Sequence, residues 1–460
     1  MSPQIATIFF ISGILGLFIL NWDWRARTSK ALWIPVVWLW IAGSRPVSVW
    51  WEGYWPQGSP DQYLEGNPLD RNVFIGLLAL GIIVLVLRKR KVGTLLRANG
   101  AILLFLSYSA VSVTWSDYPE VAFKRWIKFL GDFVMILIVL TECDYLNAIK
   151  RVLARAGFVL LPLSVLLIKY YPSVGRGYGP WEGKQYFNGV GDNKNALGMI
   201  SLILGLGALW HFLQLYHSQM NSSKVKQLIA QGVLVTTSLW LMWVANSMTS
   251  LSCFFMAAGL MAATNLRTVE RRPWVVHVLV AAILSVSLSV VFLDVGGDLL
   301  GTMGRDATLT GRTEIWSLVL GMKGNPVFGT GFESFWLGKR LEKIWSLYWW
   351  HPNEAHDGYI EIFLELGWIG VALFVIVLVT GYRKVIGAFR RDTGTGKLML
   401  AYFVVAVAYD FTESAIKALN PVWITLLLAI MAAPNLSAPE NPPPVATPIS
   451  SLNLSNSLPT

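Results

Sequence analysis

The sequence carries too little charge for a soluble protein of its length. Only 14% of its 460 residues are charged, 54% are apolar, and the mean hydropathy is +0.52. A typical soluble domain has about 25% charged residues. The apolar residues fall in blocks close to the roughly 20 residues that cross a membrane as a helix. Lipid leaves exposed backbone groups without partners, so we expect an all-α bundle.

Cysteine is scarce, and signatures of nucleotide chemistry are missing. Cys143 follows one apolar block and Cys253 lies inside another, so we expect neither a disulfide nor a metal cluster. The chain has no P-loop and no glycine-rich turn after a strand. It also lacks the alternating ten-residue segments of a transmembrane barrel. These absences argue against ATP hydrolysis and dinucleotide chemistry, and we expect no cofactor.

Thirteen apolar segments are candidate membrane spans. They lie near residues 4–21, 31–44, 73–87, 99–115, 127–141, 156–171, 196–215, 228–245, 249–265, 274–293, 358–382, 398–412 and 420–434. The second is short and rich in Trp, so it can also be interfacial or re-entrant, which would leave twelve. The predicted fold class is an all-α polytopic membrane protein with 12 or 13 transmembrane helices.

The net charge of +10 reports topology and not nucleic-acid binding, because Lys and Arg gather in alternate short loops. The basic loops are 25–30, 88–97, 150–155, 224–226, 267–272 and 383–397. The other loops, longer and more acidic, are 45–72, 116–126, 173–195 and 294–357. The positive-inside rule makes the first set cytoplasmic and turns the second outward. We therefore expect a multi-pass protein of a bacterial inner membrane, in contact with its lipids.

This topology divides the chain into four parts. Residues 1–293 hold the first ten spans, and 294–357 form a large periplasmic loop that we expect to contain short helices. Residues 358–434 supply the C-terminal transmembrane helices. Residues 435–460 are rich in Pro, Ser and Asn without apolar periodicity, which predicts a disordered cytoplasmic tail.

Of the five histidines, only His351 and His356 face outward in this topology. His356 precedes the apolar run that begins at Tyr359, so we expect it in or beside the first turn of a helix. The positive end of the helix dipole favours a neutral imidazole there. Such an imidazole can accept a proton from a sugar hydroxyl. An inert interfacial histidine is the alternative, and the neighbouring Glu354 and Asp357 favour function.

Outward cations near the membrane also need an explanation. Arg176, Lys194 and Arg312 lie on the outward side against the general charge bias. An anionic ligand is one explanation, and a diphosphate fits the fork of an arginine. Salt bridges to nearby carboxylates or contacts with phospholipid headgroups are the alternatives. A metal site is not expected, because His351 and His356 are five residues apart and do not share a helical face.

Five segments then follow one another in a familiar order: SVTWSDYPEVAFKRW (112–126), NGVGDNKNALG (188–198), GRTEIW (311–316), NPVFGTGFESFW (325–336) and AHDGYIEIFLELGWIG (355–370). Together they resemble the O-antigen ligase and polysaccharide polymerase family of integral-membrane glycosyltransferases, over about residues 100–380. The resemblance implies a fold of the GT-C type. It also implies transfer of a glycan from undecaprenyl diphosphate to an acceptor sugar, with inversion and without metal or nucleotide.

The resemblance also implies roles for particular residues. His356 corresponds to the catalytic histidine, Arg176 and Arg312 to the diphosphate-binding arginines, and Lys194 to the lysine of a KN-x-LG motif. We expect Glu354 or Asp357 to orient the imidazole. The family often has Asn after the histidine, where this chain has Asp357, and often has Ser-Arg where this chain reads NSM at 246–248. The second departure removes one possible cationic contact.

Two questions stay open at the level of sequence. The acceptor is lipid A–core for a ligase and a lipid-linked glycan for a polymerase, and the two activities share motifs. The alternative from another class is a transporter of lipid-linked sugars or polysaccharide. Transporters favour charges at the membrane midplane in broken helices. In this chain the charges gather in the outer loops, which favours an enzyme.

Overall fold

The structure is a computed structural model that describes residues 1–22, 28–52, 64, 66–179, 183–264, 266, 274–292, 308–322 and 324–437. Three predicted features therefore lie wholly or partly outside the described residues. They are the basic segment 267–272, the first part of the large loop (293–307) and the tail from residue 438 onward.

Helices make up nearly all of the regular structure in the described ranges. The elements are α1 (Pro3–Leu20), η1 (Lys30–Leu32), α2 (Trp33–Ala42), α3 (Val47–Glu52), α5 (Pro68–Leu87), α6 (Lys89–Ala98), α7 (Gly100–Ser112), η2 (Val113–Trp115), α8 (Pro119–Leu140), α9 (Tyr145–Tyr170), α10 (Pro172–Gly175), β1 (Arg176–Tyr178), β2 (Gln185–Phe187), α11 (Lys194–Tyr216), α12 (Ser222–Val244), α13 (Met248–Ala263), α15 (Trp274–Phe292), α17 (Thr308–Gly321), α18 (Gly338–Leu347), α19 (Gly358–Arg391), α20 (Thr393–Tyr409) and α21 (Pro421–Ser437). The two strands pair antiparallel in one small hairpin.

The chain is an all-α polytopic membrane protein, as its composition predicts. All thirteen candidate spans fall on helices. Among the described helices, six are long and apolar enough to cross a membrane: α1, α5, α9, α11, α12 and α19. The pair α6 and α7 with η2, bent by 89°, gives a seventh if it is counted as one span. Five further apolar segments are shorter, and the Trp-rich segment Lys30–Ala42 is one of them.

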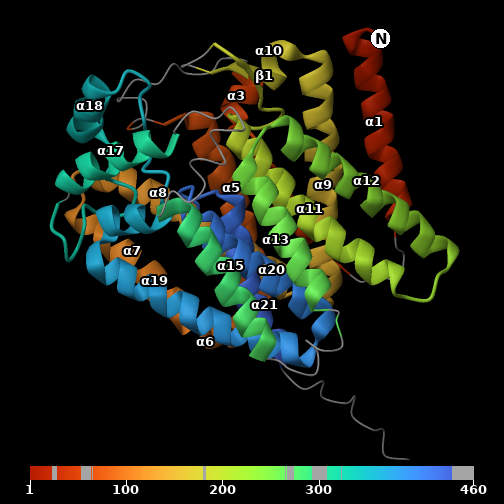
Figure 1. Cartoon of the computed structure of the whole chain (residues 1–460). Helices are drawn as coiled ribbons and strands as arrows, with labels where there is room; N and C mark the ends of the chain where they lie inside the picture. The colour runs from red at the N-terminus through yellow and green to blue at the C-terminus, as the bar shows by residue number, and fades with distance from the viewer. Residues whose placement is uncertain are drawn as a thin grey trace, which may run out of the picture.

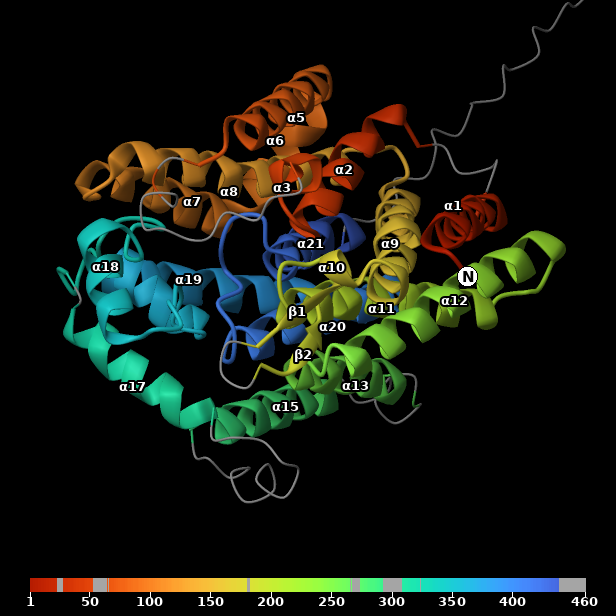
Figure 2. The same cartoon turned by 90° about the horizontal axis from the view of Figure 1, so that it is seen from above.

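The last two helices form the centre of the bundle. Seen from above, α20 and α21 are enclosed by α8, α9, α11, α13 and α19 (Figure 2). Residues 398–410 of α20 and its C-cap, and residues 420–433 around α21, are buried on every side of the helix. A helix that is apolar all round belongs inside a bundle and not against lipid or water. In contrast, α1 and α5 leave most of their apolar side chains exposed, as helices that face lipid do.

The segments predicted to face outward gather at one end of the bundle. The hairpin β1–β2, α10 and α18 lie at the end that is uppermost in Figure 1, and the basic helix α6 lies at the opposite end. The large loop and the 173–195 loop therefore lie at one end of the bundle and the basic segment lies at the other, as the charge pattern predicts. Which face of the membrane each end occupies stays a prediction.

The described part of the large loop packs as a small module on the start of α19. Its own apolar cluster includes Ile315 of α17, Phe335, and Leu341 and Ile344 of α18. A turn held by the bridge between Asn325 and Gly329 joins α17 to α18. The module lies beside the upper part of the bundle (Figure 1) and carries the segment that leads into the site.

The candidate span 358–382 is not one continuous helix, because α19 breaks at Gly367. Its φ of +64° lies in the left-handed region that favours glycine. An added Cβ would lie 2.3 Å from the carbonyl oxygen of Val327. The turn of the outer module causes the break, because the carbonyl of Pro326 accepts from the N–H of Trp368 at 3.0 Å. The first two turns of α19 therefore belong to the outer module.

Labelling of single cysteines tests the predicted sidedness. In a Cys143→Ser background, Tyr178→Cys on β1 should react with a membrane-impermeant maleimide in intact cells. Arg90→Cys on α6 should react only after the cells are permeabilised. Both positions are exposed, and the remaining Cys253 is buried, so access decides the outcome. Labelling of Arg90→Cys and not Tyr178→Cys in intact cells would reverse the topology.

Candidate functional site

His356 lies at the junction of the outer module and the membrane-spanning helices. It stands one residue before Asp357, the N-cap of α19, and has a φ of +54°. The backbone on its N-terminal side is fixed at Ala355, whose carbonyl accepts from Trp316 Nε1 at 2.8 Å. Its position beside the first turn of a helix agrees with the sequence. The positive φ shows that the surrounding contacts hold this residue in a conformation that non-glycine residues adopt rarely.

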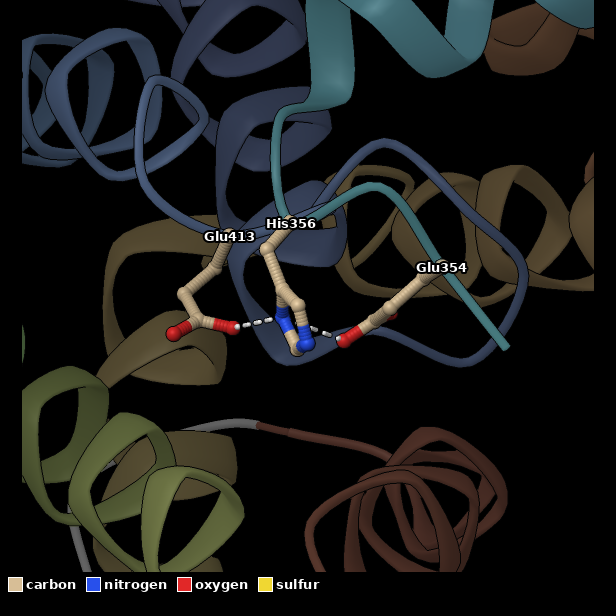
Figure 3. A group of neighbouring side chains, drawn as sticks. All are labelled: Glu354, His356 and Glu413. Carbon is tan, nitrogen blue, oxygen red and sulfur yellow. Dashed lines mark hydrogen bonds and ion pairs between the residues drawn. The ribbon is translucent and has the colours of Figure 1, made fainter. Parts of the chain in front are cut away.

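Two carboxylates flank the imidazole. His356 Nδ1 lies 3.1 Å from Glu354 Oε1 and 3.2 Å from Glu413 Oε2. Glu354 and His356 come from the same loop, whereas Glu413 comes from the loop between α20 and α21 (Figure 3). The side chains are partly buried, with 27% of His356 and 12% of Glu413 exposed. A histidine between two carboxylates is stabilised in its charged form.

The remaining oxygens of these carboxylates have partners of their own. Lys417 Nζ lies 2.5 Å from Glu354 Oε2. Arg312 Nη2 lies 3.5 Å from Glu413 Oε1, and Asn195 Nδ2 donates to the same oxygen at 2.9 Å. Arg312 also donates to the carbonyl of Thr412 at 2.8 Å. We call Arg312, Glu354, His356, Glu413 and Lys417 the His356 cluster.

The electrostatics of the cluster correct one expectation from the sequence. Partial burial would lower the pKa of His356, but the carboxylates of Glu354 and Glu413 outweigh it and raise the pKa to about 10. The imidazole is therefore protonated at neutral pH, and the expectation of a neutral ring is wrong. The helix dipole that was expected to keep it neutral acts over about one turn and is far weaker than two adjacent carboxylates.

The pKa of Glu354 shifts in the opposite direction, and that of Lys417 in the same direction as His356. Burial acts against ionisation of Glu354, but Lys417 and His356 together hold its pKa well below the usual range. The corresponding effect on Lys417 is a raised pKa, with Glu354 offsetting the burial. With His356 protonated, the cluster has three positive and two negative groups, which leaves one net positive charge.

The loop that carries Glu413 and Lys417 is held by carboxylates from three places in the chain. Asp410 Oδ1 accepts from the N–H of Ala415, and Glu333 Oε1 accepts from the N–H of Ala418. Asp132 Oδ2, on α8, accepts from the N–H of Leu419 at 2.9 Å. Carboxylates that accept from backbone N–H groups fix a loop that has no ladder of its own.

Glu361, in the first turn of α19, joins both loops of the site. Its Oε1 accepts from the N–H of Ala355 at 2.5 Å and lies 3.5 Å from Ser414 Oγ. Both of its oxygens also accept from Trp336 Nε1, at 3.0 and 2.8 Å. Ala355 precedes His356 and Ser414 follows Glu413, so Glu361 ties the two sides of the imidazole to one helix.

The other predicted site residues have different surroundings. Asp357 does not orient the imidazole: its Oδ1 accepts from the N–H of Ile360 at 2.9 Å and caps α19. Arg176 begins β1, donates through Nε to the carbonyl of Ile168 at 2.8 Å, and lies over the ring of Phe187. Lys194 is exposed in the first turn of α11 and has no ion-pair partner within the described ranges. Of the predicted cations, only Arg312 joins the cluster.

The segment that contains Arg176 and Lys194 is nevertheless tied to the site. The guanidinium of Arg45, at the end of α2, is buried and donates to the carbonyls of Val174, Gly189 and Gly191. This fixes the start of α11, where Asn195 reaches Glu413. Arg45 is thus a structural cation, and charge alone does not distinguish it from cations that bind a ligand.

A cavity of about 300 Å³ opens beside the cluster. It is lined by Glu354, Glu413 and Lys417, and also by Asp70 of α5, Lys128 of α8 and Asp192. This volume is at the lower end of the range for small-molecule sites, which is about 300–1,000 Å³. The residues around it supply hydroxyl, amide, carboxylate and ammonium groups, which suits a polar ligand.

Glu354, His356 and Glu413 offer ligand atoms within 4.8 Å of one another and could in principle bind a metal ion. The donor set argues against this. Lys417 and Arg312 already occupy the second oxygens of the two carboxylates. A metal ion would also need a deprotonated ring nitrogen, whereas the carboxylates hold the ring protonated. We read the arrangement as an ion-pair network.

Comparison with known proteins shows which protein family the chain resembles. A family model described as O-antigen ligase matches residues 232–375, a range that includes Arg312, Glu354 and His356 and ends before Glu413. The chain is also 26% identical over 358 residues to the exopolysaccharide production protein ExoQ of Rhizobium meliloti (strain 1021), which covers 74% of this chain and 77% of the relative. The chain is thus similar to O-antigen ligases and to a protein of exopolysaccharide production. These matches confirm the resemblance to the O-antigen ligase and polysaccharide polymerase family.

Glu413 and Lys417 are the members of the site that the sequence reasoning missed. They lie between the spans near 398–412 and 420–434, in a loop of seven residues. The alternation of basic loops would have placed this segment outward, opposite 383–397. The alternation of basic loops was therefore a signal in the sequence for the position of Glu413 and Lys417.

Replacement of Glu361 tests whether it holds the site together. Glu361→Ala leaves the N–H groups of Ala355 and Trp336 without their acceptor, which should destabilise the protein by about 1–3 kcal/mol per buried group. Glu361→Gln keeps one acceptor oxygen and should lose less. Thermal unfolding of purified protein in detergent measures both, with the exposed Glu342→Ala as control. Unfolding of Glu361→Ala at the wild-type temperature would contradict this role.

Proposed function

We propose that the protein is a membrane glycosyltransferase that transfers a glycan from undecaprenyl diphosphate to an acceptor sugar on the periplasmic face. The observation that carries the proposal is the His356 cluster, a protonated imidazole and an arginine that share one carboxylate beside a polar cavity. The similarity to O-antigen ligases and to a protein of exopolysaccharide production supplies the glycan chemistry.

The donor has an activated leaving group, so the protein has to stabilise the charge that grows on the departing diphosphate. Arg312 presents a planar fork suited to phosphate oxygens. Protonated His356 adds a second charged donor, and the cluster as a whole carries net positive charge. Preorganised donors of this kind lower the barrier because they need not reorient during the reaction. Arg176 and Lys194 are proposed to bind the same diphosphate from the 173–195 segment.

A protonated imidazole cannot accept the proton of the acceptor hydroxyl, so another group has to. We assign this role to the carboxylate of Glu413, which lines the cavity and contacts both His356 and Arg312. Attack by the acceptor oxygen on the anomeric carbon opposite the diphosphate gives inversion. The oxygen loses its proton to Glu413, and the diphosphate leaves with the electron pair of the broken bond.

The acceptor follows from the relative and not from the site geometry. The chain aligns over most of its length with a protein of exopolysaccharide production, which favours polymerisation of lipid-linked repeat units. Ligation to lipid A–core is the second possibility within the class. A cluster of genes for repeat-unit assembly and export beside this gene would support the polymerase.

Replacement of His356 tests the site directly. His356→Gln removes the charged donor and should reduce glycan transfer by about 100- to 1,000-fold, the effect of losing one preorganised donor. The matched control is His351→Gln, because His351 stacks on Trp345 at 4.4 Å outside the cluster. Transfer is measured with lipid-linked glycan and purified protein in detergent. Wild-type rates for His356→Gln at equal protein level would remove His356 from the mechanism.

The pH profile tests the protonation state. The folded pKa of His356 is raised to about 10, so the charged ring and its stabilising contribution are present at neutral pH and are lost as the pH rises through 10. Transfer should therefore persist to about pH 9 and fall above it. If the neutral ring were the base, the rate would instead rise about tenfold per pH unit between 7 and 9.

Replacement of Arg312 separates the effect of charge from that of geometry. Arg312→Lys keeps the charge but loses the fork, and it should still reduce transfer by at least about tenfold.

Addition of EDTA should leave the wild-type rate unchanged if the ion-pair network and not a metal ion does the chemistry. Purified protein in detergent has only one compartment. If the purified protein transfers no glycan in detergent but moves lipid-linked glycan across the membrane of proteoliposomes, the protein is a transporter.

A further inference from the structure

The cavity beside the His356 cluster is lined by two lysines in different electrostatic situations. Lys417 is paired with Glu354 through a direct ion pair. Lys128, on α8, has no carboxylate within ion-pair distance in the part of the chain that the structure describes. Its ammonium lies 5.2 Å from the centre of the Phe74 ring. A cation–π contact of this kind compensates only part of the cost of removing an ammonium from water.

Asp70 and Glu333 offset the charge of Lys128 only at longer range, because neither forms an ion pair with it within the described residues. Asp70 lines the cavity; its Oδ1 accepts from the N–H of Ser48 at 2.9 Å and its Oδ2 from Ser48 Oγ at 2.6 Å, so both oxygens are engaged with α3. Asp192 also lines the cavity, together with neutral amides, among them Asn193, Asn195 and Asn420.

Lys128 is thus a partly buried cation that lines the cavity and, among the described residues, has no direct ion-pair partner. Ionisable side chains at membrane depth that lack a structural partner mark binding sites for ions or substrates. The same cavity is lined by Glu413, the proposed proton acceptor. A sugar bound in it can place a hydroxyl at Glu413 and a substituent at Lys128.

We propose that this cavity is the acceptor subsite and that Lys128 binds an anionic group carried by the acceptor glycan. This deepens the proposed function, on which it rests, by assigning an acidic acceptor. The anion is a carboxylate on the sugar itself or the diphosphate of a second lipid-linked glycan. Both present oxygen anions to the ammonium. Arg312 and His356 bind the donor diphosphate, so the two anions occupy separate places.

Direct binding tests the subsite without requiring turnover. Purified full-length protein in detergent is titrated with oligogalacturonate, with a neutral malto-oligosaccharide and with inorganic pyrophosphate. We expect wild type to bind the acidic oligomer about tenfold more tightly than the neutral one, the effect of one charge-assisted contact. Lys128→Gln should remove this preference and Lys128→Arg should keep it. The exposed Lys124→Gln, one turn earlier on α8, is the matched control.

The probes distinguish the source of the anion. If Lys128→Gln weakens pyrophosphate binding and leaves the two oligosaccharides equal in both proteins, the ligand is a diphosphate. If it weakens only oligogalacturonate binding, the ligand is a sugar carboxylate. Equal binding of all three probes by wild type and Lys128→Gln, with unchanged thermal stability, would overturn the subsite.

A second measurement separates this inference from the proposed function. In the transfer assay, Lys128→Gln should raise the KM for an acidic acceptor about tenfold and leave kcat within about a factor of two. If wild type transfers no glycan but shows the Lys128-dependent preference in binding, the subsite stands and the proposed function fails. If wild type transfers glycan and Lys128→Gln has an unchanged KM, the proposed function stands and the subsite fails.

Discussion

The other ion pairs of the site are needed because His356 contacts two carboxylates. A half-buried histidine next to Glu354 and Glu413 is stable only when the ring is charged and the remaining carboxylate oxygens are paired. Lys417 and Arg312 meet that requirement. Each of them comes from a different part of the chain. The requirement is met only if α17, the start of α19 and the loop between α20 and α21 are held together.

The surrounding carboxylates meet this second requirement. Asp132, Glu333 and Glu361 accept backbone or indole N–H groups, and none of them forms a short ion pair with the cluster. They hold the loops by hydrogen bonds, and Glu333 and Glu361 also act on the charge of Lys417 at longer range.

Much of the fold and part of the site could be predicted from the sequence. Hydropathy located all thirteen helical segments, and the positions of Lys and Arg brought Arg312 and His356 to the same end of the bundle. The geometry of α19 could not be predicted, because its break at Gly367 depends on a tertiary contact with the turn at 325–329. The protonation of His356 could be predicted only in part, because Glu354 is two residues away, whereas Glu413 is 57 residues away in the chain and enters only through the fold.

The predicted cations show a further limit of charge as a signal. Arg45, Arg176, Lys194 and Arg312 are all outward basic residues, and the sequence treats them alike. In the structure Arg45 is buried under three carbonyls, and Arg312 contacts a carboxylate of the cluster. Only the partners of each side chain separate a structural cation from one that can face a ligand. For Asp357 a local signal existed, since Asp directly before an apolar helical run is a common N-cap.

The central position of α20 and α21 has a consequence for biogenesis. These helices are the last described ones to leave the ribosome, yet α8, α11, α13 and α19 pack around them, and the loop between them supplies Glu413 and Lys417. The earlier helices must therefore wait in the membrane with an unfilled centre, and the loop of Glu354 and His356 meets Glu413 and Lys417 only when the final hairpin inserts. A chain released early would have neither a packed core nor a complete set of charges, so partial products are inactive by construction.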